Sequence, residues 1–449
     1  MPTHNLEQLL LSSLRVLLLQ GPVGPFFQEL SNWLLYHQKA VWKINFNGGD
    51  LHYFRAVNPN PSLNCAVTVE QAAHASASSF NTSQQAQVLN YTQPATEFAD
   101  YLRQLVAKQN IDTMVCFGDC RLYHQIAKQV CKELGLKFWV FEEGYFRPHY
   151  VTLEATGVNA YSHLPKNASY YRKHMRRNDE PAVAPISSGF WAAAWLATIY
   201  YLYMWWYQAA FPHYAHHRAT SLKTYARCWL KSAWRRCCYV IPEALFTHKV
   251  EQGKLGEFFL LALQVHSDSQ VKVHSTYNSV AEFLEEVLIN FAMYAPERTH
   301  LVVKHHPMDR GFTNYREQIN KIVAAYPQLE GRIHYVLDVP LPILLRKAQG
   351  LVCLNSTTGL SALVHNLPVL TLGDCAYDFA QLTHQGSLAS FWVSPQAPDA
   401  TSFAAYRRYH LYTTQLNGSF YKYVRFVTPN QQLNQTRSWE ETSDSRLSL

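Results

Sequence analysis

Short apolar runs alternate with longer amphipathic stretches in the first third of the chain. Strands are expected at residues 16–19, 41–46, 113–117 and 137–141, and helices at residues 26–37, 96–108 and 122–134. Strands that alternate with helices in this way are typical of a parallel sheet flanked by helices. The apolar run at residues 9–19 is interrupted by Ser12, Ser13 and Arg15, so it is interpreted as the first core strand and not as a secretory signal.

The same alternation returns between about residues 245 and 390. Five further strands are expected there, at residues 258–263, 301–304, 333–335, 350–354 and 369–372. The pattern therefore predicts an α/β fold of two doubly wound halves that face each other. The polar stretch at residues 74–94 is expected to be a surface excursion, and the polar tail at residues 431–449 is expected to be disordered.

The size of the chain supports this division. With 449 residues and 51.6 kDa it exceeds one ordinary domain, and a composition that is 48% hydrophobic and 16% charged suffices for two cores. The predicted parts are an N-terminal Rossmann-like domain at 1–165, an aromatic and basic helical segment at 166–244, a C-terminal Rossmann-like domain at 245–395, helices that pack back at 396–430 and a disordered tail at 431–449.

One segment raises the question of a membrane. Residues 190–211 contain no charged side chain and are long enough, at ~1.5 Å per residue, to cross a bilayer. Their Trp and Tyr side chains are spread along the whole run, whereas a spanning helix concentrates such rings at its two ends. Basic residues flank the run on both sides: Arg172, Lys173, Arg176 and Arg177 before it, and His213, His216, His217, Arg218, Arg227, Lys231, Arg235 and Arg236 after it. An interfacial helical hairpin on an anionic membrane surface is the favoured interpretation, and the alternatives are a buried interdomain helix and a true span.

Charge and cysteine content narrow the class of protein. The formal net charge of +7 and the pI of about 8.8 indicate a mildly basic surface. No cluster of Lys and Arg carries a nucleic-acid-binding signature, so an anionic lipid and an anionic sugar nucleotide are preferred as partners and no nucleic acid is expected. The nine cysteines are scattered, with no CxxC pair and no zinc spacing, which is typical of reduced thiols in a cytoplasmic protein.

Polar turns follow the first two expected strands. Gly21 and Gly24 lie in the segment QGPVGPFF, which resembles a phosphate loop only weakly because neither GxGxxG nor GxxxxGK[ST] is present; a tight turn is the alternative. Asn47 and Asp50 in NFNGGD end the next strand at the same edge of the sheet. Their amide and carboxylate groups suit sugar hydroxyls, although turn formation alone would also explain them.

Acidic side chains follow the next two strands. Asp119 and Arg121 lie in GDCR, and Glu142, Glu143 and Arg147 lie in EEGYFRP. The carboxylates should sit side by side at the carboxyl edge of the sheet, where catalysis is expected. Such a carboxylate acts as a general base or attacks an anomeric carbon directly, and a neighbouring arginine holds it ionised or binds an anionic substrate. The alternative is a structural ion pair, Asp119 with Arg147 or Glu143 with Arg121.

The C-terminal half offers three further polar turns. After the strand at 258–263, hydrogen-bonding side chains stand almost in a row, and the candidates for substrate binding are Gln264, Asp268, Ser269 and Gln270. A connecting loop would not need so many polar groups. An N-cap role for Ser267 or Asp268 is the alternative interpretation.

The other two turns predict a grip on a phosphate from two sides. His305 and His306 follow an apolar strand, Pro307 turns the chain, and Lys304 and Arg310 add positive charge. About fifty residues later, hydroxyl groups precede an apolar helix at Ser356, Thr357 and Thr358, where free backbone N–H groups also bind anions. A cation on one side and hydroxyls on the other would offset the charge on a departing phosphate. An ordinary N-cap is the alternative for the hydroxyl turn. No DxD-type acidic motif stands beside these loops, so no metal and no other cofactor is expected.

Taken together, these segments resemble the capsule polysaccharide biosynthesis and export proteins of the KpsS/LipB type, which are β-Kdo transferases of Gram-negative bacteria. The matching segments are LLLQGPVGPFF, INFNGGD, FGDCR, FEEGYFRPHYVTLE, PHYAHHR, LQVHSDSQ, VKHHPMDRG and LNSTTGL, and they cover roughly residues 14 to 375. The resemblance implies a GT-B glycosyltransferase with a central cleft and a membrane-associating insertion, which uses CMP-Kdo as donor and a phosphatidylglycerol-type lipid as acceptor at the cytoplasmic face of the inner membrane. It also implies, as partners, a KpsC-type poly-Kdo transferase and the capsule export complex.

The resemblance also implies roles for individual residues. GT-B enzymes that use CMP-sugars are similar in an acidic pair before Gly, a His-Pro turn and a Ser-rich turn. By that likeness Glu143 takes the position of the catalytic carboxylate, while His306, Ser356 and Thr357 contact the CMP phosphate. Retention in the family implies that Glu143 is a nucleophile. Many relatives carry Asp as the second acidic residue, and this departure leaves the nucleophile open between Glu143 and Asp119.

Two other functions stay open from the sequence. One is transfer from another CMP-sugar, for example by a sialyltransferase. The second is a non-catalytic export or scaffold protein of the capsule machinery, against which the two carboxylate turns and two phosphate loops argue.

Overall fold

The computed structural model describes residues 2–54, 85–175, 177–186, 189–216 and 222–429. The chain forms two compact units. The first consists of Met1–Val158, Arg177–His217 and Arg408–Leu449, and the second of Asn159–Arg176 and Arg218–Arg407. The segment 166–244, predicted as a separate insertion, is therefore divided between the two units.

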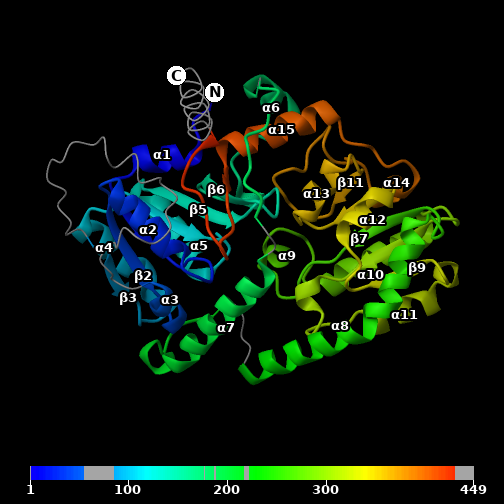
Figure 1. Cartoon of the computed structure of the whole chain (residues 1–449), viewed down its shortest axis with the longest axis horizontal. Coiled ribbons are helices and arrows are strands. Elements are labelled where there is room, and N and C mark those ends of the chain that lie inside the picture. The colour runs from blue at the N-terminus through cyan, green and yellow to red at the C-terminus, as the bar shows by residue number, and fades with distance from the viewer. Residues whose placement is uncertain (1, 55–84, 176, 187–188, 217–221, 430–449) are drawn as a thin grey trace, which may run out of the picture. The chain divides into compact units, whose positions relative to one another are not determined.

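A seven-stranded sheet forms the first unit, in the order β12-β6-β5-β4-β1-β2-β3 (Figure 1). Its strands are β1 Arg15–Leu18, β2 Ala40–Asn45, β3 Gln87–Asn90, β4 Thr113–Phe117, β5 Lys137–Glu143, β6 Tyr150–Ala155 and β12 Gln415–Asn417. The first five run parallel, whereas β6 is antiparallel to β5 and β12 is antiparallel to β6. The helices of this unit are α1 Asn5–Ser12, α2 Phe26–Tyr36, α3 Gly48–Tyr53, α4 Phe98–Gln109, α5 Leu122–Leu134 and α7 Phe190–Trp206.

Side chains that alternate along β1 build the two cores of this unit. Val16 and Leu18 point to one face of the sheet, where they join the apolar side of α2, while Leu17 and Leu19 point to the other face and join α4 and α5. The sheet is thus buried on both faces, as parallel sheets require. Because β1, β2, β4 and β5 run parallel, their carboxyl ends lie at the same edge of the sheet.

The second unit contains a five-stranded parallel sheet in the order β11-β10-β7-β8-β9. Its strands are β7 Phe258–Ala262, β8 His300–Lys304, β9 Ile333–Val336, β10 Gly350–Cys353 and β11 Val369–Thr371. The helices are α6 Ala168–His174, α8 Leu222–Glu251, α9 Ser269–Val273, α10 Val280–Tyr294, α11 Arg316–Ala325, α12 Leu341–Lys347, α13 Thr358–Val364 and α14 Leu388–Val393. Helix α15, Ala400–Thr413, crosses the boundary between the units. The α/β fold with two Rossmann-like halves is confirmed.

Three expectations differ from the structure. The run at residues 9–19 is not one strand: α1 continues to Ser12, because Leu6 and Leu9 bury one helical face, and β1 begins only at Arg15. The stretch at 74–94 is not wholly an excursion, since β3 pairs with β2; residues 74–84 lie outside the described ranges. The segment 396–430 contains β12 in addition to α15. The tail at 431–449 and the basic residues Arg176, His217 and Arg218 also lie outside the described residues.

The aromatic run forms α7, which lies beside α3 (Figure 1). Trp191, Trp195 and Trp206 of α7 are exposed, whereas Tyr200 of the same helix is buried. In the part of the chain that the structure describes, no helix combines the length and the apolar character that crossing a bilayer demands. Attachment of α7 to a membrane surface stays a prediction.

Candidate functional site

Two adjacent carboxylates end strand β5. The strand extends as far as Glu143 because Glu142 pairs with Thr152 and Glu143 with Val151 on antiparallel β6. The Glu142 side chain accepts a hydrogen bond from the backbone N–H of Glu143 at 2.9 Å. Burial raises the pKa of Glu142 to about 7; that hydrogen bond opposes the rise and the charge of Glu143 adds to it. A carboxyl group with such a pKa exchanges protons readily at neutral pH, which is what acid–base catalysis requires.

The second carboxylate, Glu143, has a tyrosine partner from the far end of the chain. The Tyr421 hydroxyl is hydrogen-bonded to the Glu143 carboxylate, and burial together with this negative charge raises the pKa of Tyr421. The phenol therefore stays protonated and donates to Glu143. Both side chains are partly exposed. The turn that follows is tight, because a Cβ on Gly144 would lie 2.0 Å from the carbonyl oxygen of Tyr150. Arg147 is exposed and its Nε donates to the Gly144 carbonyl at 3.3 Å.

Asp119 reaches the same edge but points into the protein. The residue is 1% exposed. Its carboxylate accepts the backbone N–H of Val158 at 3.2 Å and lies 3.7 Å from Nζ of Lys128 on α5. Burial raises the pKa of Asp119, and Lys128 opposes that rise. The charge of Asp119 also raises the pKa of Glu142, so these carboxylates do share one electrostatic environment.

Arg121 serves the neighbouring loop. Its guanidinium donates to the Gln20 side chain at 3.0 Å and to the Gly21 carbonyl at 3.3 Å. Across the described ranges, neither of the two ion pairs considered from the sequence, Asp119 with Arg147 or Glu143 with Arg121, is formed.

The loops after β1 and β2 meet in a polar network that includes α7. Asn47 begins α3 by accepting the backbone N–H groups of Gly49 and Asp50. The Tyr200 hydroxyl from α7 donates to Asp50 at 3.0 Å and accepts from the Asn47 amide at 2.8 Å and from the Gln20 amide at 3.1 Å. Gln20 also donates to the Tyr214 hydroxyl at 2.9 Å. Asn47 and Asp50 are thus brought together, but their polar groups are engaged by tyrosines.

The glycines of the first loop pack against hydrophobic side chains. A Cβ on Gly21 would lie 2.9 Å from the ring of Phe27, and one on Gly24 would lie 3.1 Å from Leu196 of α7. The cavity that Gly21, Gly24 and Asp50 help to line holds only about 10 Å³. That volume fits about one water molecule and no sugar or phosphate. The conformation of this loop therefore favours the tight-turn interpretation.

In the second unit, the loops after β7 and β10 are joined directly. The Gln264 amide donates to the Asn355 side chain at 2.9 Å and to Asp268 at 3.3 Å. Asp268 is the N-cap of α9, since it accepts the backbone N–H of Gln270 at 2.9 Å. Asn355 was not among the predicted site residues, although it stands in the same turn as Ser356. The side chain of Ser269 lies outside the described residues.

The two histidines after β8 differ in exposure. His305 is buried, its Nδ1 is 2.8 Å from the Tyr335 hydroxyl, and its Nε2 is buried without a hydrogen-bond partner among the residues described. Burial lowers the pKa of His305, which favours the neutral ring. His306 is partly exposed and its Nδ1 accepts the backbone N–H of Met308 at 3.2 Å. His306 is therefore the more accessible of the two.

A hydrogen-bonded pair that was not predicted from the sequence, His266 with Asp309, supports this turn. Asp309 is fully buried, hydrogen-bonded to the ring of His266, and accepts the Thr313 hydroxyl at 2.5 Å. His266 belongs to the loop after β7, so the pair links that loop with the His306 turn. The acidic residue in HHPMDRG was a signal for this link, but its partner could not be named from the sequence.

Lys304 and Arg310 do not join the histidines. Nζ of Lys304 donates to the Leu337 carbonyl at 2.6 Å, and Arg310 is paired with Asp338. Burial lowers the pKa of Lys304 to about 8, against the charges of Asp338 and Glu243. Both cations are engaged on the β9 side of the sheet. They stabilise the loop after β9.

The hydroxyl turn stands at the start of α13. Ser356 accepts the backbone N–H of Thr358 at 3.1 Å and donates to its hydroxyl at 3.0 Å, while Thr357 takes the N-cap position. All three residues are partly exposed. Gly359 is required here, because a Cβ would lie 2.2 Å from the Tyr377 hydroxyl, which donates to the Ser356 carbonyl at 2.5 Å. The turn is thereby held rigid with its hydroxyls at the sheet edge.

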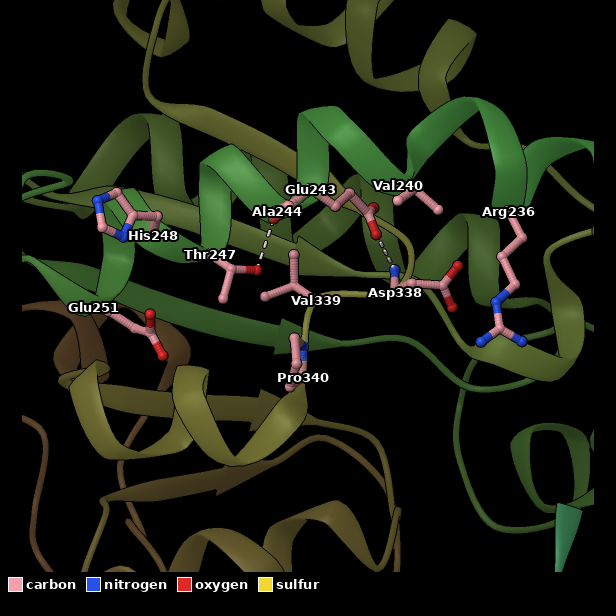
Figure 2. Close-up of a pocket in the computed structure, with 10 residues that line it drawn as sticks. All are labelled: Arg236, Val240, Glu243, Ala244, Thr247, His248, Glu251, Asp338, Val339 and Pro340. Atoms are coloured by element: carbon pink, nitrogen blue, oxygen red, sulfur yellow. Dashed lines mark hydrogen bonds between the residues drawn. The ribbon is translucent and has the colours of Figure 1, made fainter.

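A larger cavity lies elsewhere in the second unit. It measures about 510 Å³ and is lined by α8 and the loop after β9, as Figure 2 shows. Its lining includes Arg236, Glu243, His248, Glu251 and Asp338, and none of the predicted site residues. We therefore do not place the reaction there. Among the residues with a described position, no group of three or more His, Cys, Asp or Glu side chains is arranged to hold a metal ion. Metal independence stays a prediction.

The family model and the two relatives described next are all capsule polysaccharide proteins. A family model described as "Capsule polysaccharide biosynthesis protein" matches residues 112–421. The chain is 41% identical over 430 residues to "Capsule polysaccharide modification protein LipB" of Neisseria meningitidis serogroup A, covering 95% of this chain and 96% of the relative. It is 38% identical over 424 residues to "Capsule polysaccharide export protein KpsS" of Escherichia coli, covering 93% and 99%.

A solved structure is similar at a lower level. The β-Kdo 2,7-transferase KpsC of Thermosulfurimonas dismutans matches 79% of this chain and 92% of its own, with 13% sequence identity and a TM-score of 0.38. No conclusion about this chain rests on that likeness.

Proposed function

The chain belongs to the family of capsule polysaccharide biosynthesis proteins, and we propose that it is a retaining β-Kdo glycosyltransferase. In this proposal it transfers Kdo from CMP-Kdo to a phosphatidylglycerol or lysophosphatidylglycerol acceptor and so begins the poly-Kdo linker of a group 2-type capsule. The observation that carries the proposal is the pair of partly exposed carboxylates at the end of β5, Glu142 with its raised pKa and Glu143 beside the Tyr421 hydroxyl.

The environments of the carboxylates favour Glu143 over Asp119 as the nucleophile. The Asp119 side chain is fully shielded and engaged by Lys128 and the Val158 N–H, so its attack on a sugar would require breaking an internal ion pair. Glu143 is partly exposed, and its neighbour Tyr421 donates a hydrogen bond that orients the carboxylate. In the proposal, Asp119 supports the turn and Glu143 reacts.

The reaction proceeds in two displacements at one carbon. Glu143 attacks the anomeric carbon of Kdo, the bond to the phosphate oxygen breaks, and CMP leaves with the electron pair. The acceptor hydroxyl then attacks the same carbon, Glu143 departs as a carboxylate, and the hydroxyl proton passes to Glu142, whose pKa of about 7 suits that transfer. Two inversions give net retention.

Residues of the second unit supply the proposed donor site. His306 and the Ser356 and Thr357 hydroxyls are partly exposed and follow strands at the carboxyl edge of the sheet, which supports the proposal that they contact the CMP phosphate. The hydrogen bond between Gln264 and Asn355 connects the loop after β7 with the loop after β10 and fixes the spacing of these two loops. Lys304 and Arg310 are left out of this site because they are engaged with Leu337 and Asp338.

The proposed location is the cytoplasmic face of the inner membrane, with peripheral attachment. The exposed Trp side chains of α7 and the basic residues that flank that helix in the sequence support a membrane surface as partner. A KpsC-type transferase and the capsule export complex are the further proposed partners.

Incubation with CMP-Kdo and, separately, with CMP-sialic acid tests the proposal through the release of CMP. We expect release from CMP-Kdo, and a Glu143→Gln variant should lower it by more than about 10³-fold because the nucleophile is lost. Asp119→Asn is the matched control, with a smaller loss of turnover, and both variants should keep the circular dichroism spectrum of the wild type. Preference for CMP-sialic acid would favour the sialyltransferase alternative. Full turnover by Glu143→Gln would refute the assigned site.

A further inference from the structure

Helix α8 carries an apolar stripe on its outer face. We define the outer face as Leu230, Trp234, Cys237, Ile241 and Leu245, which recur every three or four residues along a helix of 30 residues and therefore share one side. Their side chains are open to solvent: Leu230 is 73% exposed, Trp234 65%, Ile241 72% and Leu245 67%. A stripe of large apolar side chains with so little cover marks a contact surface.

The opposite face of α8 is fixed to the second unit. Ser232, Glu243 and Val250 are buried on that side. The Glu243 carboxylate accepts the backbone N–H groups of Leu337 and Asp338 in the loop after β9, the latter at 2.6 Å, and Figure 2 shows the bond to Asp338. Without Glu243 these two backbone N–H groups would lose their hydrogen-bond acceptor, so the contact holds α8 against the loop after β9.

A second attachment reaches the segment that follows the His306 turn. Arg235 donates to the backbone carbonyls of Arg310 and Thr313, at 2.5 and 2.7 Å. Gly311 allows the two backbones to meet, since a Cβ there would lie 1.9 Å from the Cys228 carbonyl oxygen. Helix α8 therefore connects its outer face with the loop that carries His306. A partner bound to the outer face would be linked to that loop through this helix.

The positive charge of α8 indicates which kind of partner binds the outer face. From Leu222 to Ile241 the helix contains no acidic residue, and Arg227 and Lys231 are exposed beside the apolar stripe. A basic helix with a narrow apolar stripe suits an anionic bilayer surface, where apolar side chains enter the interface and basic ones contact headgroups. A second copy of this chain is disfavoured, because two such faces would bring like charges together.

We propose that the outer face of α8 is a docking surface for anionic lipid, distinct from α7, which holds the His306 loop of the second unit at the membrane. The docking surface itself stands on the exposure, spacing and charge of α8. Its meaning for catalysis, that the donor sugar is presented near a lipid acceptor, rests on the proposed function.

Two native thiols report on this face directly. Cys237 and Cys238 are exposed, and cleavage after Arg236 and Lys249 isolates them in one tryptic peptide. The full chain is treated with a water-soluble maleimide alone, with phosphatidylcholine vesicles, and with vesicles of equal parts phosphatidylglycerol and phosphatidylcholine, and labelling of that peptide is followed by mass spectrometry. We expect the anionic vesicles to slow labelling by at least about fivefold and the neutral ones to have little effect. Equal rates in all three conditions would overturn the proposal.

Substitutions test which side chains bind. Serine at Leu230, Trp234, Ile241 and Leu245 should weaken binding to the anionic vesicles by at least about tenfold in a flotation assay. The matched control places serine at four exposed apolar residues elsewhere in the second unit, Met293, Tyr294, Val364 and Val393, and should bind like the wild type. Because all eight positions are exposed, both variants should fold. Equal binding by the two variants would contradict the proposal, as would labelling that slows with protein concentration in the absence of lipid, which would identify a second copy as the occupant.

Release of CMP from CMP-Kdo, measured without vesicles, separates this inference from the proposed function. Protection of Cys237 by anionic vesicles without any release would retain the docking surface and refute the transferase. Release together with unprotected thiols would retain the transferase and refute the docking surface.

Discussion

Three carboxylates that look alike in the sequence have different environments. The acidic turns after β4 and β5 were predicted to share one edge because parallel strands end together, and Asp119 and Glu142 do influence each other there. The direction of each side chain could not be predicted, since it depends on Lys128 for Asp119 and on Tyr421 for Glu143. Tyr421 lies far along the chain, and no local pattern links it to β5. Sequence therefore predicts which carboxylates meet, and packing determines which of them is exposed.

Glu142 makes the stability of the protein depend on pH. Its pKa of about 7 exceeds the ordinary value of 4.5, so between these pH values the folded state binds a proton that the unfolded state has lost. The free energy of unfolding therefore falls as pH rises through this window. Glu142→Gln removes the effect and should gain about 2 kcal/mol over the wild type between pH 5 and pH 8, less than the full shift implies because the side chain is partly exposed.

Urea unfolding at four pH values between 5 and 8 measures this gain. Glu330→Gln, at an exposed position, is the control and should show no such trend. A constant difference between Glu142→Gln and the wild type across the window would show that burial does not perturb this carboxyl group.

At the scale of elements, continuous apolar runs were the most reliable signal. All five strands of the second sheet were predicted within about two residues. Strands β7, β8, β10 and β11 are buried over nearly their whole length and therefore mostly apolar, whereas the edge strand β9 is only partly buried. The strands β3, β6 and β12 were missed. Strand β3 lies in a polar stretch, β6 follows an antiparallel turn, and β12 is a short strand far along the chain from its partner β6. The face by which α7 packs on the first unit could not be predicted either. Aromatic residues surround the whole helix, so no periodic stripe revealed which side would face Gly48 and Gly49 of α3.

The Tyr200 hydroxyl should anchor α7 to the first unit. Tyr200→Phe leaves Asp50, Asn47 and Gln20 without one hydrogen-bond partner in a buried network, and the free energy of unfolding should fall by about 1–3 kcal/mol. Tyr203→Phe is the matched control on the same helix, because the Tyr203 ring, which stacks on His52 at 3.8 Å, is kept. Chemical denaturation compares the two, and equal losses in both variants would mean that the polar network does not hold the helix.

At the scale of the molecule, alternation of strands and helices predicted two α/β halves, and both are present. Helices that pack back were expected at residues 396–430, but the strand β12 that pairs with β6 and the contact of Tyr421 with Glu143 were not. Such long-range returns carry no local sequence pattern. The family assignment rests on similarity over most of the chain, whereas the donor, the acceptor and the roles of individual residues belong to the proposal.

The central claim is that this protein transfers Kdo from CMP-Kdo to a lipid. Mass spectrometry of lysophosphatidylglycerol after incubation with CMP-Kdo and the full chain tests it most directly. The account predicts that the lipid gains the mass of at least one Kdo and that CMP accumulates in step with it, with neither change in the Glu143→Gln variant. An unchanged lipid beside folded protein and intact CMP-Kdo would contradict it.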